Sequence, residues 1–170
     1  MKTLKTIYDT DVGYNNPEPE TYKLRSAARA VVFDADKKVA LLHATKKSYH
    51  KLPGGGIEEG EDMETALKRE LLEEIGCKAN NLQELGIIEE YRNGFQEHQT
   101  SYCFIASLVG KKGTNDLEDD EIAHGFEPVW MDLKTAIQTL EGEINNENYE
   151  ARFMVLRDLT FLKEAEIQLK

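Results

Sequence analysis

The chain has 170 residues, of which 40% are hydrophobic, and this is enough for one globular domain with its own core. Its net charge of −11 argues against long nucleic acid as a partner, because Lys and Arg hold the phosphates of such partners. No apolar run approaches the length of about 18 residues that a membrane span needs, so we expect no membrane partner.

Residues 1–20 are polar and include Asn15-Asn16-Pro17-Glu18-Pro19. We therefore expect an irregular N-terminal arm at 1–20, followed by a single domain at 21–170. Such an arm can reach a second subunit, so the sequence allows a homodimer. We expect a cytoplasmic protein, because residues 1–20 contain no apolar leader. Cys77 and Cys103 lie in apolar segments and are interpreted as buried thiols.

The remaining chain alternates strand and helix signals. The predicted strands are 26–33, 39–43, 49–52, 82–92, 100–109 and 127–131. The turn at 34–38 makes the first two a hairpin, and 93–98 and 111–124 are predicted to be polar loops. Helices are predicted at 62–76, 133–140 and 149–165. Helices on both sides of a mixed β-sheet give an α+β fold, a three-layer α/β/α sandwich.

The helix predicted at 62–76 carries an unusual set of acidic residues. Asp62 is its expected N-cap and Gly76 its expected end. Glu70, Glu73 and Glu74 recur at i, i+3 and i+4, which brings their side chains to one side of the helix. Three like charges held together are unfavourable unless a cation lies among them, and Mg²⁺ is the natural candidate for oxygen ligands.

The same helix has an apolar stripe that consists of Met63, Leu67, Leu71 and Ile75. Glu70 and Glu74 fall at the border of this stripe and not opposite it. This position favours a functional cluster over the alternative of a solvated, Glu-rich surface helix. Arg69 precedes Glu73 by four residues, so it can pair with that carboxylate and fix its rotamer.

Three consecutive glycines, Gly54, Gly55 and Gly56, precede the acidic helix. They lack the Cβ atoms that would keep a ligand at a distance. A loop of this kind can offer a backbone carbonyl to a cation or an N–H to a phosphate. The glycines are therefore expected to form the second wall of the site.

The segment 55–77 resembles the Nudix box at each of its fixed positions, with Cys77 where the family usually has an aliphatic residue. The matching residues are Gly55, Glu61, Arg69, Glu70, Leu71, Glu73, Glu74, Gly76 and Cys77. The resemblance implies the Nudix fold and a MutT-like pyrophosphohydrolase. Such an enzyme cleaves a diphosphate linked to another moiety by attack of a metal-activated water on phosphorus.

The resemblance also implies roles for individual residues. Mg²⁺, with Mn²⁺ as a substitute, would be held by Glu70, Glu73, Glu74 and the carbonyl of Gly55. Arg69 would orient these carboxylates, Glu61 would brace the loop, and Gly76 would end the helix. The catalytic base remains open between Glu70, Glu74 and a carboxylate from 118–121. Glu121 is the candidate from that run, and a solvated acidic loop is the alternative.

The substrate is expected to be a small molecule that contains a nucleoside diphosphate joined to another moiety. Nucleoside triphosphates, nucleotide sugars, dinucleoside polyphosphates and capped RNA ends all fit the box. A catalytically silent nucleotide-binding sensor and an isoprenoid-diphosphate isomerase are the two alternatives. The complete set of box carboxylates disfavours the sensor, and the absence of a recognisable catalytic cysteine disfavours the isomerase.

Three other kinds of residue have plainer interpretations. The histidines His43, His50, His98 and His124 lack metal-ligand spacing and are interpreted as incidental. Trp130 is expected in the core. Arg25 and Arg29 share one face of the first strand, and we favour a solvated face over a contact with a substrate phosphate.

Overall fold

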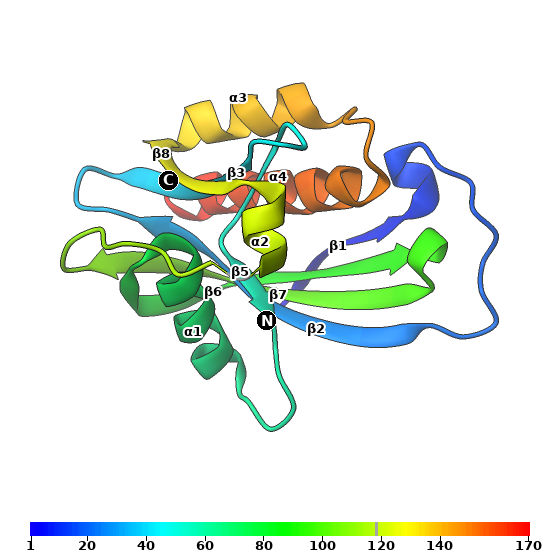
Figure 1. The fold of residues 1–170 in the computed structure, drawn as a ribbon, viewed down its shortest axis with the longest axis horizontal. Helices are drawn as coiled ribbons and strands as arrows, with labels where there is room; N and C mark the ends of the chain where they lie inside the picture. Colours follow the sequence, from blue (N-terminus) through cyan, green and yellow to red (C-terminus); the bar gives the residue numbers. More distant parts are fainter. Residues whose placement is uncertain (118) are drawn as a thin grey trace.

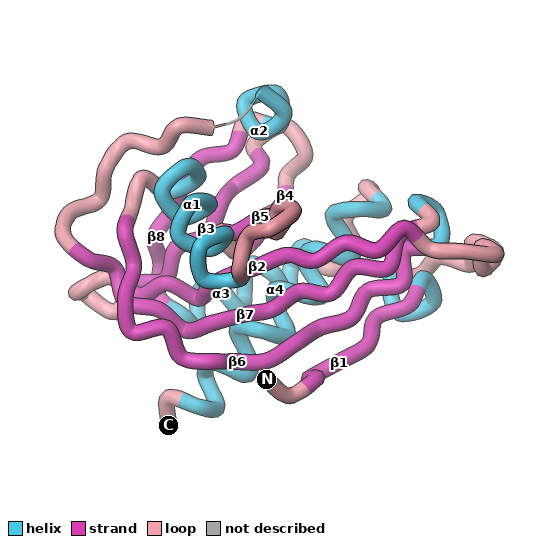
Figure 2. Tube along the Cα trace, turned by 90° about the horizontal axis from the view of Figure 1, so that it is seen from below, coloured by secondary structure: helices cyan, strands magenta, loops and turns pink. Residues whose placement is uncertain are grey.

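The computed structural model describes residues 1–117 and 119–170, and of Asp120 and Glu121 it describes only the backbone. A mixed β-sheet forms the central layer (Figures 1 and 2). Its strands are β1 (Thr3–Tyr8), β2 (Lys23–Phe33), β3 (Lys38–Ala44), β4 (Tyr49–Lys51), β5 (Gly54–Gly56), β6 (Lys78–Arg92), β7 (Glu97–Val109) and β8 (Phe126–Asp132). Their order is β1-β6-β7-β2-β3-β4, with β5 paired to β2 and β8 paired to β3.

Helices cover both faces of this sheet. They are α1 (Met63–Ile75), α2 (Asp119–His124), α3 (Leu133–Glu143) and α4 (Tyr149–Gln168), with short 3-10 turns at Asp9–Val12 and Asn93–Phe95. Figure 2 shows α1 on one face, and α3 and α4 on the other. The predicted three-layer α/β/α sandwich is thus confirmed.

The apolar side chains of α1 and α4 form the two halves of the core around the sheet. On α1, Leu67, Leu71 and Ile75 are buried as the stripe predicts, whereas Met63 in the first turn is 38% exposed. On α4, Phe153 and Phe161 are completely buried. Among the described residues, no helix combines the length and apolar character required to cross a membrane.

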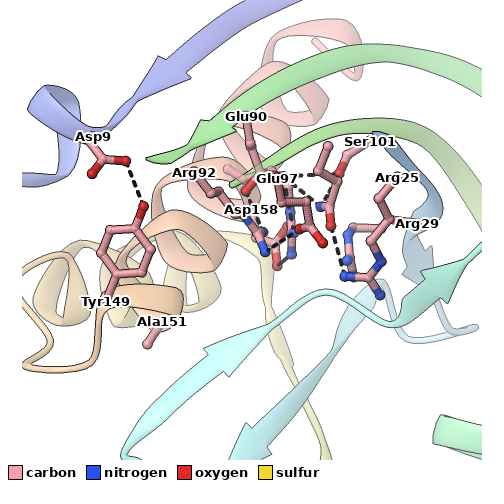
Figure 3. A network of polar contacts seen from close by, with 12 residues as sticks. Asp9, Arg25, Arg29, Glu90, Arg92, Glu97, Ser101, Tyr149, Ala151 and Asp158 are labelled. Atoms are coloured by element: carbon pink, nitrogen blue, oxygen red, sulfur yellow. Dashed lines mark hydrogen bonds and ion pairs between the residues drawn. The ribbon is translucent and has the colours of Figure 1, made fainter. Parts of the chain in front are cut away.

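The expected irregular arm at 1–20 is wrong for residues 3–12. Thr3–Tyr8 is a strand that runs parallel to β6, with Ile7 opposite Glu90 and Tyr8 opposite Tyr91. A parallel edge strand depends on a partner distant in the sequence, so local composition cannot predict it. Asp9, which follows the strand, is buried and accepts a hydrogen bond of 2.6 Å from the Tyr149 hydroxyl (Figure 3).

Two predicted loops are also shorter than expected. Within 93–98, a 3-10 turn occupies Asn93–Phe95 and β7 already begins at Glu97, where it pairs with Arg92 of β6. The charged loop at 111–124 ends in helix α2. In both places a short polar segment gains regular structure from its neighbours, which propensity does not capture.

Candidate active site

Helix α1 brings the box carboxylates to one side, and local signals explain its limits. The Asp62 side chain accepts a hydrogen bond of 2.8 Å from the Thr65 N–H and caps the first turn. Gly76 has a φ of 62°, the left-handed conformation in which glycine commonly ends helices. The predicted helix is therefore confirmed at both ends.

Glu74 is the most buried member of the cluster, with a side chain that is 1% exposed. Its Oε2 accepts a hydrogen bond of 2.6 Å from the N–H of Gly54, and its Oε1 lies 2.7 Å from Lys51 Nζ. The sequence analysis missed Lys51. Tyr49 and Lys51 are the two inward-facing residues of β4, so the alternation in this strand was the available signal.

Arg69 lies at the centre of the other carboxylates and ties them to the glycine strand. Its guanidinium donates to Glu61 at 3.0 and 3.2 Å, to Glu70 at 2.9 Å and to Glu73 at 3.2 Å. It also donates to the carbonyl of Gly56 at 3.1 Å. The pairing with Glu73 follows from the i, i+4 spacing. Glu61 also accepts a hydrogen bond of 3.2 Å from the Glu58 N–H, and its bracing role stays a prediction. Hydrogen bonding to Glu61 is the main reason that the pKa of Arg69 is raised.

Glu70 lies directly against Gly55. A Cβ on Gly55 would overlap the Glu70 carboxylate, so only glycine permits this approach. Burial raises the pKa of Glu70, and the neighbouring Glu74 raises it further, although Arg69 and Lys51 oppose both effects. The negative charge of Glu70 is therefore only partly compensated.

The donor chemistry of this cluster fits a divalent cation. The four carboxylates Glu61, Glu70, Glu73 and Glu74 face only two paired cations, Arg69 and Lys51, in the described site. Hard oxygen donors with an excess of negative charge suit Mg²⁺ or Mn²⁺. No three His, Cys, Asp or Glu side chains of the described residues already converge as a metal cage. In the described arrangement, Arg69 and Lys51 supply the positive charge among the carboxylates.

The loop after β7 attaches to the end of α1 and leads to α2. The N–H of Gly113 donates to the Gly76 carbonyl at 3.1 Å, and the N–H of Asp116 donates to the Glu73 carbonyl at 2.7 Å. The backbone of Glu121 belongs to α2, but its side chain lies outside the described residues. Its role as a loop carboxylate stays a prediction.

The two arginines of β2 are not on a solvated face, so that interpretation is wrong. Arg29 is 3% exposed and donates a hydrogen bond of 2.7 Å to the Gly54 carbonyl. Arg25 is half-buried and donates to Gln99 at 3.0 Å (Figure 3). The reason is that α4 covers this face of the sheet with charged side chains, among them Asp158.

The other singled-out side chains lie outside the carboxylate cluster. His50 contacts Glu143 at 2.7 Å, and His98 contacts Glu89 at 2.7 Å. Cys77 and Cys103 are both buried without a disulfide, and burial raises the pKa of both thiols. Trp130 is partly buried against the core, as expected.

Comparisons with known proteins agree with this geometry. The family model described as NUDIX domain matches residues 23–153. Diphosphoinositol polyphosphate phosphohydrolase 3-alpha of Mus musculus is 30% identical over 127 residues, which is 73% of either chain. RNA pyrophosphohydrolase of Sulfurovum sp. (strain NBC37-1) is 58% identical over 41 residues, 24% of this chain and 25% of that protein.

Solved structures give the same fold. The NUDIX hydrolase from Nitrosomonas europaea superposes with a TM-score of 0.66 at 17% identity, and the match covers 86% of this chain and 90% of that one. The MutT NUDIX hydrolase from Burkholderia pseudomallei gives a TM-score of 0.55 at 22% identity, over 66% of this chain and 85% of that one. The chain therefore belongs to the NUDIX family and is a hydrolase that acts on pyrophosphate bonds.

Proposed function

We propose that the chain is a Mg²⁺-dependent hydrolase that cleaves the diphosphate linkage of a nucleoside diphosphate joined to another moiety. Nucleoside triphosphates, nucleotide sugars and dinucleoside polyphosphates belong to this class. The observation that carries the proposal is the cluster of Glu70, Glu73 and Glu74, in which Glu70 lies against Gly55. The cluster retains excess negative charge beside Arg69 and Lys51. An acidic site of this kind suits an anionic substrate once a divalent cation is bound.

A bound Mg²⁺ would neutralise the diphosphate oxygens and lower the pKa of a water molecule. Glu70, Glu73, Glu74 and the Gly55 carbonyl would hold the ion. Mn²⁺ would substitute, since it accepts the same oxygen donors.

The base is best sought at Glu70 or Glu121. Glu74 already accepts from Lys51 and from the Gly54 N–H, so it is suited to holding the glycine strand. The pKa of Glu70 is raised by burial and by Glu74, which makes its carboxylate the better proton acceptor. Arg69 keeps Glu70 and Glu73 in fixed rotamers, so the attacking water meets a preorganised carboxylate.

The preferred substrate class follows from the Lys and Arg side chains of the site, which already have protein partners. Relatives at 30% identity are named as diphosphoinositol polyphosphate phosphohydrolases, and a ligand with several phosphates needs several uncommitted Lys or Arg side chains. In the described site, Arg69 and Lys51 are bound to carboxylates, and Arg29 is bound to a carbonyl. We therefore favour a nucleoside diphosphate joined to another moiety over a diphosphoinositol polyphosphate, which has phosphates around its whole ring.

A panel of purified substrates tests the proposal. It contains nucleoside triphosphates, nucleotide sugars, dinucleoside polyphosphates, RNA with a 5′-triphosphate and a diphosphoinositol polyphosphate. We expect Mg²⁺-dependent release of a phosphomonoester from a nucleotide substrate, and no release with EDTA. Turnover of the diphosphoinositol polyphosphate alone would contradict the substrate class. Binding without turnover across the panel would favour the silent sensor.

A further inference from the structure

The strand β5 holds its first residue in a conformation that only glycine readily adopts. Gly54 has a φ of 128°. A Cβ at this position would overlap the carbonyl oxygen of Ala28 and would lie 2.7 Å from the Cα of Arg29. A peptide in this region relaxes unless its surroundings fix it.

Two charged side chains hold Gly54 from different elements. Glu74 of α1 accepts a hydrogen bond of 2.6 Å from the Gly54 N–H. Arg29 of β2 donates one of 2.7 Å to the Gly54 carbonyl. Asp158 of α4 accepts a further bond of 2.8 Å from the N–H of Leu52, two residues earlier. The segment before Gly55 is thus anchored by charged groups from three elements.

Arg29 occupies a costly position for a cation. It is 3% exposed, and burial together with the nearby Arg157 lowers its pKa to about 10, although Asp158 and Glu90 oppose this. Among the described residues, nothing accepts a hydrogen bond from its Nε. A buried ion of this kind contributes little to stability compared with an apolar residue of similar size. Its directed bond to Gly54 is a contact that an apolar side chain could not replace.

We propose that Arg29 is a positioning residue for the hydrolysis. By holding the Gly54 carbonyl while Glu74 holds the Gly54 N–H, it sets the orientation of the adjoining Gly55 carbonyl and of the Glu74 carboxylate. The inference rests on the proposed function, in which these two groups bind the cation. Arg29 itself touches neither the cation nor the substrate.

The test compares Arg29→Lys and Arg29→Gln with Arg92→Lys as the matched control. Arg92 is 1% exposed, pairs with the buried Glu90 whose charge also acts on Arg29, and likewise has an Nε without an acceptor among the described residues. Its hydrogen bonds go to Glu90 at 2.7 Å and to Glu97 at 3.4 Å, and not to the glycine strand (Figure 3). Substitutions at either arginine disturb the buried charges, but only those at Arg29 alter the hydrogen bond to Gly54.

Three measurements are made on each folded variant. Amide exchange of Gly54, relative to the core amide of Val31, reports on the anchoring of the strand. Mn²⁺ binding without substrate, followed by electron paramagnetic resonance, reports on the cation site. The Mg²⁺ concentration for half-maximal turnover reports on the assembled enzyme.

We expect Arg29→Gln to speed relative exchange at Gly54 about 10-fold and to weaken Mn²⁺ binding about 10–100-fold, as for residues that orient metal ligands. Arg29→Lys should restore part of both. Arg92→Lys should lower the melting temperature but change neither the relative exchange at Gly54 nor the affinity for Mn²⁺. Wild-type exchange and Mn²⁺ affinity in Arg29→Gln, or equal changes in Arg92→Lys, would overturn the inference. If the proposed function is wrong, the wild-type chain will show neither Mn²⁺ binding nor turnover. The exchange rate of the Gly54 amide in the variants will still show whether Arg29 holds the strand.

Discussion

The three box carboxylates differ in their access to solvent. The side chain of Glu73 is 33% exposed, that of Glu70 is 13% exposed and that of Glu74 is 1% exposed. A cation that enters the proposed site would therefore meet Glu73 first, the most exposed of the three carboxylates.

Replacing Glu73 with Gln keeps the size of the side chain and removes one charge. We expect turnover to fall about 10²–10³-fold, the scale of losing one electrostatic stabiliser. The melting temperature without metal should be unchanged. The wild type should gain stability on addition of Mg²⁺, because the ion binds the folded state, and the variant should gain less. Glu64→Gln is the control, since Glu64 is exposed on the same helix and pairs with Lys68. Turnover close to wild type in Glu73→Gln would refute its place in the cluster.

Arg69 is predicted to act through the carboxylates that it holds. An exposed i, i+4 pair contributes only about 0.3–0.5 kcal/mol, so a surface role predicts a small stability loss and unchanged catalysis for Arg69→Ala. The five hydrogen bonds to three glutamates and the Gly56 carbonyl predict instead a loss of about 10–100-fold in kcat.

Arg69→Lys should recover only part of this loss, because Lys keeps the charge but lacks the planar fork. Lys68→Ala, which breaks an exposed pair one residue earlier, serves as the control. Kinetics and thermal melts on the same samples separate the two roles. An unchanged kcat in both Arg69 variants would show that Arg69 only forms a surface ion pair and does not act in catalysis.

At the residue level, spacing was sufficient where partners lie on one element. The sequence predicts that Glu70, Glu73 and Arg69 meet, because i, i+3 and i+4 neighbours meet on any helix. Asp62 and Gly76 predict the helix ends, because they are typical capping residues. Lys51 and Arg29 were missed or misread because their partners come from other elements. Burial of a Lys or Arg side chain cannot be predicted from local sequence when its partner lies on another element of the fold.

At the scale of elements, the end of α1 and the loop before α2 are tightly packed. A Cβ on Gly76 would lie 2.6 Å from the Thr114 carbonyl oxygen and 2.7 Å from the carbonyl carbon of Gly113. Gly76 also has a positive φ, which L residues disfavour. Gly113 and Thr114 therefore pack so closely on Gly76 that no side chain fits there.

Gly76→Ala is expected to destabilise the fold by more than about 1 kcal/mol, from strain and from displacement of this loop. Gly142→Ala serves as the control and is expected to change stability in the opposite direction. Gly142 lies in α3 with no atom within 4 Å of its Cβ position, so alanine there should stabilise the helix by about 0.5–1 kcal/mol. Urea unfolding measures both. Equal effects of the two substitutions would contradict the packing argument.

The elements that the sequence predicted well are those with local signals. Capping residues and the 3.6-residue period defined α1, and the turn at 34–38 defined the β2–β3 hairpin. By contrast, β1 and α2 are short and polar, and β1 in particular depends on the edge of β6. Their patterns contain no period that distinguishes them from loops.

At the scale of the whole molecule, a buried ionic network connects the sheet to α4 (Figure 3). Glu90 lies at its centre and is completely buried, 2.7 Å from Arg92 and 3.5 Å from Arg157. Burial by itself raises the pKa of Glu90, but the two guanidinium groups outweigh it and lower the pKa from 4.5 to about 2. The network therefore makes stability depend on pH.

The sign of this dependence follows from the lowered pKa. The stabilisation from ionised Glu90 is complete above pH 4.5 and is lost as the pH falls towards about 2. The free energy of unfolding should fall through this window. In Glu90→Gln the slope should be shallower, and at neutral pH the variant should lose about 3–5 kcal/mol, because buried arginines lose their partner. Glu84→Gln, which is exposed on the same strand, should follow the wild type. A wild-type curve that is flat from pH 5 to 2 would contradict the ionised state of Glu90.

The pairing of β1 with β6 also constrains the order in which the chain can fold. Thr3–Tyr8 is synthesised well before its partners, which run from Ile87 to Tyr91. Closing so long a loop is slow, so β1 joins the sheet after the β6–β7 hairpin has formed. Until then the outer edge of β6 has unpaired backbone groups, where a second nascent chain can add a strand. Strand β1 therefore docks after strands that are made later than itself, and its docking covers a sheet edge to which another chain could pair.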